Sequence, residues 1–228
     1  MNTISYKNLL FPVVPKTLMV YGAAGCGKTN VLNSIIMGLT KEIDCKDLKI
    51  LYVDAKGINF VLQNVKCPCI EYVKLCGEVI DNENIEYVMS VLKDWSSSEM
   101  GYHSHCVVML SDVRANKYLS KWFHTIMNAV KSTANVSLVV DDPCGIEDVY
   151  GYSLLNEFSC KLVGACSAQM SYKLLGDDSA AGMSIGDFIL SIDGPVSGFE
   201  QRKAVSFEFI YDHELEEHLN KLSLQAAE

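Results

Sequence analysis

The sequence Thr17-Leu-Met-Val-Tyr-Gly-Ala-Ala-Gly-Cys-Gly-Lys-Thr29 decides the fold. A short β-rich run, Thr17–Tyr21, stops at a cluster of glycines, and the apolar residues that follow recur with the spacing of one helix face. Those apolar residues are Val31, Leu32, Ile35, Ile36 and Leu39. The stretch therefore predicts a buried strand, a glycine-rich loop and a helix, in that order.

Gly22–Thr29 matches the phosphate-binding pattern G-x-x-x-x-G-K-[ST], in the strand-to-helix context that its mechanism needs. Glycines let successive backbone N–H groups converge on phosphate oxygens, and the helix N-terminus adds partial positive charge. Lys28 supplies a full charge, and the Thr29 hydroxyl is a ligand for Mg²⁺. We predict an ATP site made of Gly22, Ala23, Ala24, Gly25, Cys26, Gly27, Lys28, Thr29 and Asn30. The alternative is a glycine-rich connector without a ligand.

Apolar runs and helical patterns alternate along the rest of the chain. The predicted strands lie at 49–54, 106–110, 136–140 and 161–165, followed by an antiparallel hairpin of 188–192 and 203–211. The predicted helices lie at about 81–95, 118–130 and 170–175, and a last helix is capped by Asp212. Short, continuously apolar strands that alternate with crossover helices are typical of an α/β fold with a mostly parallel sheet covered on both faces.

Composition limits the classes of function. The chain has 228 residues, of which 49% are hydrophobic and 21% charged, as in a soluble globular protein. The net charge of −9 opposes a partner that is bound by neutralising many phosphates, so no nucleic acid is expected. We find neither an apolar run long enough to span a membrane nor a secretion signal in residues 1–16.

The nine cysteines follow no regular framework, which favours a reducing cytosol over a disulfide scaffold. A zinc site could be imagined from cysteines and histidines of two sequence clusters. These are Cys67, Cys69, Cys76, His103, His105 and Cys106. Because the sequence contains no Cys-x-x-Cys pair and a helical pattern separates the clusters, we interpret the cysteines as buried or idle thiols.

Hydrolysis needs more than a phosphate loop, because a later buried strand must also supply an acid that orders the metal. Two strands are candidates: 106–110 continues into Ser111 and Asp112, and 136–140 continues into Asp141 and Asp142. On the bare pattern, the second strand with its paired acids is the better one.

Over 18–222 the order of features resembles the FtsK/SpoIIIE family of RecA-like (ASCE) P-loop ATPases. The resemblance rests on the phosphate loop with Leu32-Asn-Ser-Ile35, on Asp54-Ala-Lys-Gly57 and on Gly186-Asp-Phe-Ile-Leu190. It implies one domain over 1–228: an N-terminal lead-in (1–16), a RecA-like core (17–180), and a C-terminal hairpin and helix (181–228).

The resemblance also implies a degenerate site. Ser111 stands where family members carry the metal-ordering Asp, and Asp112 where they carry the catalytic Glu. Mg²⁺ would be held by Thr29 and Ser111 only weakly, because a neutral ligand lacks the charge of a carboxylate. With Arg114 and Arg202 the only arginines, no arginine finger matches the motif, so ATP hydrolysis is expected to be weak or absent. The open alternative is that Asp141 and Asp142 form an intact pair.

Among such families, the chain looks like a late module of the membrane-anchored coupling ATPases of type VII secretion, of the EssC and EccC kind. That implies a cytoplasmic module whose partners are neighbouring ATPase modules and small helical secretion substrates, with the membrane reached only through other parts of the parent protein. An active DNA translocase or packaging motor, and an interaction module that no longer uses nucleotide, are the alternatives.

Overall fold

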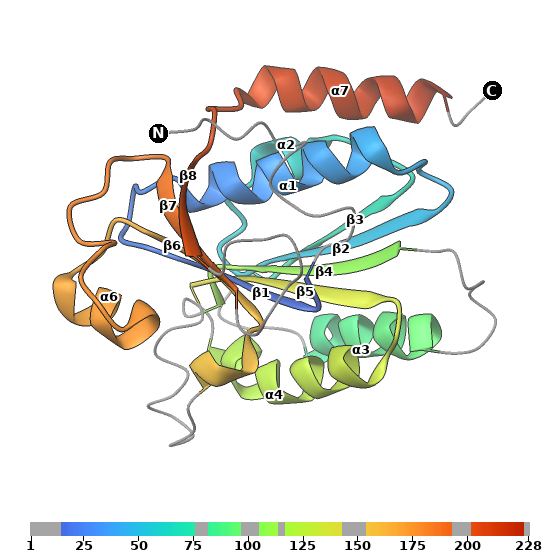
Figure 1. The fold of residues 1–228 in the computed structure, drawn as a ribbon. Helices are drawn as coiled ribbons and strands as arrows, with labels where there is room; N and C mark the ends of the chain where they lie inside the picture. Colours follow the sequence, from blue (N-terminus) through green and yellow to red (C-terminus); the bar gives the residue numbers. More distant parts are fainter. Residues whose placement is uncertain are drawn as a thin grey trace.

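The computed structural model describes residues 15–75, 82–96, 105–113, 117–142, 154–192 and 202–225. They form one twisted sheet with helices on both faces, as Figure 1 shows. The strand order is β3-β2-β4-β5-β1-β6-β7-β8. The strands are β1 Thr17–Tyr21, β2 Leu48–Asp54, β3 Ile70–Lys74, β4 His105–Ser111, β5 Val136–Asp141, β6 Cys160–Gly164, β7 Asp187–Ile192 and β8 Arg202–Ser206.

Strands β3 to β6 in this order pair in parallel, whereas β7 pairs antiparallel with β6, and β8 antiparallel with β7. The predicted α/β fold with a C-terminal antiparallel hairpin is therefore confirmed. Because all the parallel strands run the same way, β1, β2, β4 and β5 end at one edge of the sheet, where the loops that carry the predicted site begin.

Two groups of helices cover the sheet, one group on each face. The helices are α1 Lys28–Glu42, α2 Phe60–Asn64, α3 Asn82–Ser96, α4 Lys117–Ser132, α6 Ala168–Leu175 and α7 Asp212–Gln225, with a 3₁₀ turn at Leu154–Glu157. One core cluster joins the sheet to α1, α2 and α7, and the other joins it to α3, α4 and α6 (Figure 1). No helix within the described ranges is long and apolar enough to cross a membrane.

The structure differs from the sequence predictions at the sheet edges. Strand β3 and helix α2 were not predicted. Strand β3 buries only Val73 among its residues and so lacks an apolar run. Strand β8 ends at Ser206, and 207–211 crosses to α7 without strand structure. Helix α7 begins at Asp212 as predicted, but the Glu214 carboxylate accepts from the Tyr211 N–H at 2.9 Å, so Asp212 is not the cap.

Candidate nucleotide-binding site

The N-terminus of α1 is built to receive an anion. Gly27 precedes the helix with a left-handed φ of 104°, and no side chain caps the first turn. The first turn also contains no acidic residue. The first N–H groups of a helix have no partner within the helix, so those of α1 are available to an anion beyond Gly27.

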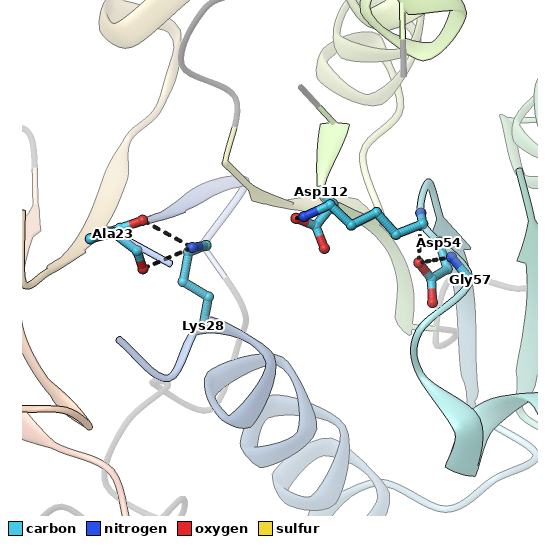
Figure 2. A network of polar contacts seen from close by, with 7 residues as sticks. Ala23, Lys28, Asp54, Gly57 and Asp112 are labelled. Carbon is cyan, nitrogen blue, oxygen red and sulfur yellow. Dashed lines mark hydrogen bonds and ion pairs between the residues drawn. The ribbon is translucent and has the colours of Figure 1, made fainter. Parts of the chain in front are cut away.

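Lys28 lies at this helix end and turns toward the phosphate loop (Figure 2). Its Nζ donates to the carbonyl oxygens of Gly22 at 2.9 Å and Ala23 at 3.3 Å. The ammonium group therefore lies over the loop whose Ala23, Ala24 and Gly25 are exposed to solvent. Thr29 follows in the first turn and is partly exposed, as the predicted role at the metal requires.

Backbone hydrogen bonds join the loop to the residues that follow β6 and precede β7. The Ala23 N–H donates to the Ala165 carbonyl at 2.7 Å, and the Gly186 N–H donates to the Cys26 carbonyl at 3.0 Å. The Cys26 side chain is buried under Gly22, and a Cβ at Gly22 would lie 2.4 Å from its sulfur. Burial raises the pKa of the Cys26 thiol. Cys26 was predicted to contact the nucleotide, and because its side chain is buried, only its backbone can do so.

Asn30 is engaged elsewhere. Its Nδ2 donates to the Glu208 carbonyl at 2.9 Å, and its Oδ1 accepts from the Ile210 N–H at 2.8 Å. The Asn30 side chain thus binds the segment between β8 and α7. What Asn30 offers to a nucleotide is its backbone N–H in the first turn of α1.

Three polar residues form a row across the ends of β2, β4 and β5. The strand register pairs Asp54 with Ser111, and Leu110 with Val140, which puts Ser111 beside Asp141. All three residues are buried, and the alternation of each strand turns them toward the face that α1 covers. The two candidate acid pairs, Ser111/Asp112 and Asp141/Asp142, therefore lie at the ends of adjacent strands, at the same end of the sheet as Lys28.

Asp54 is used by the turn that follows β2. Its Oδ1 accepts from the N–H groups of Lys56 at 3.0 Å and Gly57 at 2.7 Å. Its Oδ2 accepts from the Asn59 N–H at 3.0 Å and the Tyr72 hydroxyl at 2.9 Å. With both oxygens engaged, Asp54 shapes the turn and is a poor candidate for a metal ligand.

Asp112 follows β4 with a left-handed φ of 54°, which is uncommon for residues other than glycine. Its carboxylate makes an ion pair with Lys56. The hydrogen bond from this pair raises the pKa of Lys56. The predicted catalytic acid is therefore held by a cation from the neighbouring turn.

Asp141 is the buried carboxylate of this edge, with 1% of its surface exposed. Among the described residues its Oδ1 has no hydrogen-bond partner. Burial raises its pKa to about 7, although the charge of Lys28 acts in the opposite direction. Asp142 next to it has a left-handed φ of 52°, and its N–H donates to the Val20 carbonyl at 3.0 Å.

The structure thus brings the whole predicted phosphate loop, Thr29, Ser111 and Asp112 to one edge, with Asp141 beside them. The choice between the pair Ser111/Asp112 and the pair Asp141/Asp142 stays a prediction. Sequence reasoning missed Lys56 as the partner of Asp112, although its place in Asp54-Ala-Lys-Gly57 was a signal. Arg202 binds Asp177 at 2.7 Å and the Leu175 carbonyl at 3.2 Å, while Arg114 lies outside the described residues.

Replacing Gly27 with alanine should impair both folding and ATP binding. A side chain at φ 104° costs about 1–2 kcal/mol, and the new Cβ would lie 3.4 Å from the Gly186 nitrogen. Because relief of the strained φ would displace the loop, we expect ATP affinity to fall at least roughly tenfold. Melting curves and ATP titrations measure the two effects.

The matched control is Gly176→Ala, at the C-cap of α6, where φ is 81° and nothing lies within 4 Å of the new Cβ. This variant should lose similar stability and keep its ATP affinity. Equal ATP affinity in Gly27→Ala and the wild type would contradict the role given to Gly27.

No protein-family model matches the chain, and no curated protein sequence matches it either. Solved structures do match. The cytoplasmic domain of the Thermomonospora curvata type VII secretion ATPase EccC has a TM-score of 0.61 and 14% identity, over 92% of this chain and 28% of that one. ATPases 2 and 3 of EccC, in complex with a signal sequence peptide, give 0.62 and 12%, over 86% and 37%.

Two further structures show the same arrangement. The pCW3 conjugation coupling protein TcpA, as a monomer with ATPgS, has a TM-score of 0.61 and 14% identity, over 95% of this chain and 66% of that one. The cytoplasmic domain of EssC gives 0.61 and 13%, over 92% and 45%. This chain thus spans less than two thirds of each of these relatives. The chain therefore shares the α/β fold of the EccC, EssC and TcpA structures.

Proposed function

We propose that this protein is a nucleotide-binding module of a type VII secretion coupling ATPase, which binds ATP, hydrolyses it weakly or not at all, and serves in substrate recognition or regulation of export. The observation that carries the proposal is the contrast within one site. The anion-binding half has Lys28 and an uncapped helix N-terminus. The hydrolytic half has a neutral Ser111 and an Asp112 that is bound to Lys56.

The ion pair bears directly on the chemistry. A general base must contact the attacking water to accept its proton, and the Asp112 carboxylate is occupied by the Lys56 ammonium group. Asp112 is also one methylene shorter than Glu, and a displacement of about 1 Å can cost roughly a hundredfold in rate. Mg²⁺ would be held by Thr29 and Ser111, which supply hydroxyls without charge, so its affinity should be low.

Fold neighbours support the biological setting. EccC is a type VII secretion ATPase, one EccC structure contains a signal sequence peptide, and the TcpA structure contains ATPgS. By analogy, we propose ATP as the nucleotide, neighbouring ATPase modules and small helical secretion substrates as partners, and a cytoplasmic location with the membrane anchor elsewhere in the parent protein. The net charge of −9 favours a protein substrate over a polyanion.

Steady-state ATP hydrolysis at saturating ATP and Mg²⁺ tests the proposal. We expect turnover near the background rate for the wild type, and no further loss in Asp112→Asn. Lys28→Ala sets the background. Lys28-dependent turnover of roughly 1 per second or faster, within the usual range of enzymes, would sink the proposal.

A DNA translocase is the second candidate, because TcpA is a conjugation coupling protein of the same fold. Duplex binding at low salt that weakens steeply as salt rises would favour it, since such binding releases counterions from phosphates. The absence of any duplex binding at low salt would dismiss it.

A further inference from the structure

Three cysteines meet at the end of the sheet opposite the nucleotide site. Cys45 lies between α1 and β2, and Cys67 and Cys69 lie between α2 and β3. The Cys69 sulfur lies 3.1 Å from that of Cys45 and 3.5 Å from that of Cys67, and all three lie within 4.8 Å of one another. None of the three is in a disulfide.

This spacing suits one thiophilic cation. Three sulfurs bound at about 2.3 Å to one tetrahedral zinc lie about 3.8 Å apart, so the observed sulfurs need to move by a few tenths of an ångström. Soft thiolates select zinc or cuprous copper over hard cations such as magnesium. The sulfurs come from two loops, so a bound ion would add a direct link between the loop before β2 and the loop before β3.

The backbone already fixes these loops. The Cys69 carbonyl accepts from the Ile50 N–H at 2.7 Å, which ties this residue to β2. The Ile70 N–H donates to the Cys67 carbonyl at 3.0 Å. Pro68 between the two cysteines restricts the chain further. The sulfurs are therefore held together before any ion binds, which lowers the entropic cost of binding one.

The cysteine cluster is accessible to an ion from solvent through Cys45. Cys67 and Cys69 are buried, but Cys45 is partly exposed and lines a surface hollow of about 330 Å³ between the ends of α1 and α7. Within the described ranges, the cluster includes no fourth histidine, cysteine or carboxylate. The fourth position of a tetrahedral ion is then left to water or to a ligand from solvent.

We propose that Cys45, Cys67 and Cys69 form a binding site for a thiophilic metal ion, zinc in the first place, separate from the nucleotide site. The α1 helix of 15 residues lies between the two sites and spans roughly 22 Å. The metal therefore acts on the fold and on the face near α7, and takes no part in phosphate chemistry.

Zinc titration of the full chain, kept reduced and purified without metal, tests the site. We expect one equivalent of Zn²⁺ to bind, and Co²⁺ in its place to give the sulfur-to-metal charge-transfer absorption of thiolate ligation. Cys45→Ser and Cys69→Ser should each weaken zinc at least tenfold. Cys166→Ser, at a free thiol outside the cluster, should leave zinc affinity unchanged.

Two outcomes would overturn the proposal. One is zinc affinity that Cys45→Ser and Cys69→Ser leave unchanged. The other is a stable disulfide between Cys45 and Cys69, found by mass spectrometry in the protein as isolated from cells under thiol-blocking conditions. Cys45 is only partly buried, so its serine variant keeps the test valid if Cys69→Ser does not fold. ATP affinity measured in parallel should not change, so failure here is distinct from failure of the proposed function.

Discussion

The Lys28→Ala protein is expected to bind ATP roughly a hundredfold more weakly than the wild type. Hydrogen bonds to charged groups contribute about 1.5–3 kcal/mol, and each 1.4 kcal/mol is tenfold in affinity. Nζ lies over the phosphate loop at 2.9 Å from the Gly22 carbonyl, where it can transfer its hydrogen bonds to phosphate oxygens. Calorimetric titration with ATP, with and without Mg²⁺, measures the loss.

Lys46→Ala is the matched control, because its ammonium group is exposed and pairs only at 3.4 Å with the exposed Asp44. That variant should bind ATP like the wild type, since surface pairs contribute little. If Lys28→Ala and Lys46→Ala bind ATP equally well, the glycine-rich loop is a connector and the nucleotide site is elsewhere.

Asp141→Asn is expected to stabilise the ligand-free protein at pH 8 by on the order of 2–4 kcal/mol. The side chain is buried, and burial raises its pKa from the usual 3.8 to about 7. Holding the charged form in the folded state is therefore costly, whereas a neutral amide is cheaper to bury. The midpoint of thermal unfolding should rise by roughly 5–10 °C in a chain of this size.

The gain depends on pH with a definite sign. Between pH 3.8 and 7 the folded state holds a proton on Asp141 that the unfolded state has lost, so wild-type stability falls as pH rises through this window. The advantage of the Asp141→Asn variant should be small at about pH 4 and complete above about pH 7. Asp44→Asn, at an exposed carboxyl whose pKa is lowered by the Lys46 N–H, should give no such gain. A stability difference for Asp141→Asn that is flat with pH would contradict the raised pKa.

The same variant bears on the choice between the two acid pairs. If Asp141 orders the metal, Asp141→Asn should weaken Mg-ATP binding while ATP binding without Mg²⁺ is kept. If Ser111 and Asp112 occupy that role, Mg-ATP binding should survive the substitution. The two measurements on one protein therefore separate a structural cost from a functional role.

Much of the fold could be predicted from sequence, because buried parallel strands are continuous apolar runs. Strand β4, with every residue from Cys106 to Ser111 buried, is such a run, and so is β5. Strand β3 could not be predicted in this way, because it lies at the sheet edge and buries only Val73 fully. Its position depends on pairing with β2, whose residues are distant from β3 in the sequence.

The site could be predicted in part for a similar reason. Gly27 and Lys28 belong to a local pattern, so their placement follows from neighbours in the chain. The pairing of Lys56 with Asp112 joins residues far apart in sequence, and it depends on β2 and β4 being adjacent. The meeting of Cys45 with Cys69 likewise depends on how the chain folds back, and no spacing rule contains it.

The two hydrogen bonds between Asn30 and the segment before α7 connect the start of α1 to the C-terminal part of the chain. One side chain in the first turn of α1 binds both Glu208 and Ile210, so a displacement of that turn would also act on the segment that leads into α7. A ligand that shifted the start of α1 would therefore be expected to shift this segment as well. A chain that ended after β8 would keep the residues of the phosphate loop and lose their connection to the C-terminal helix.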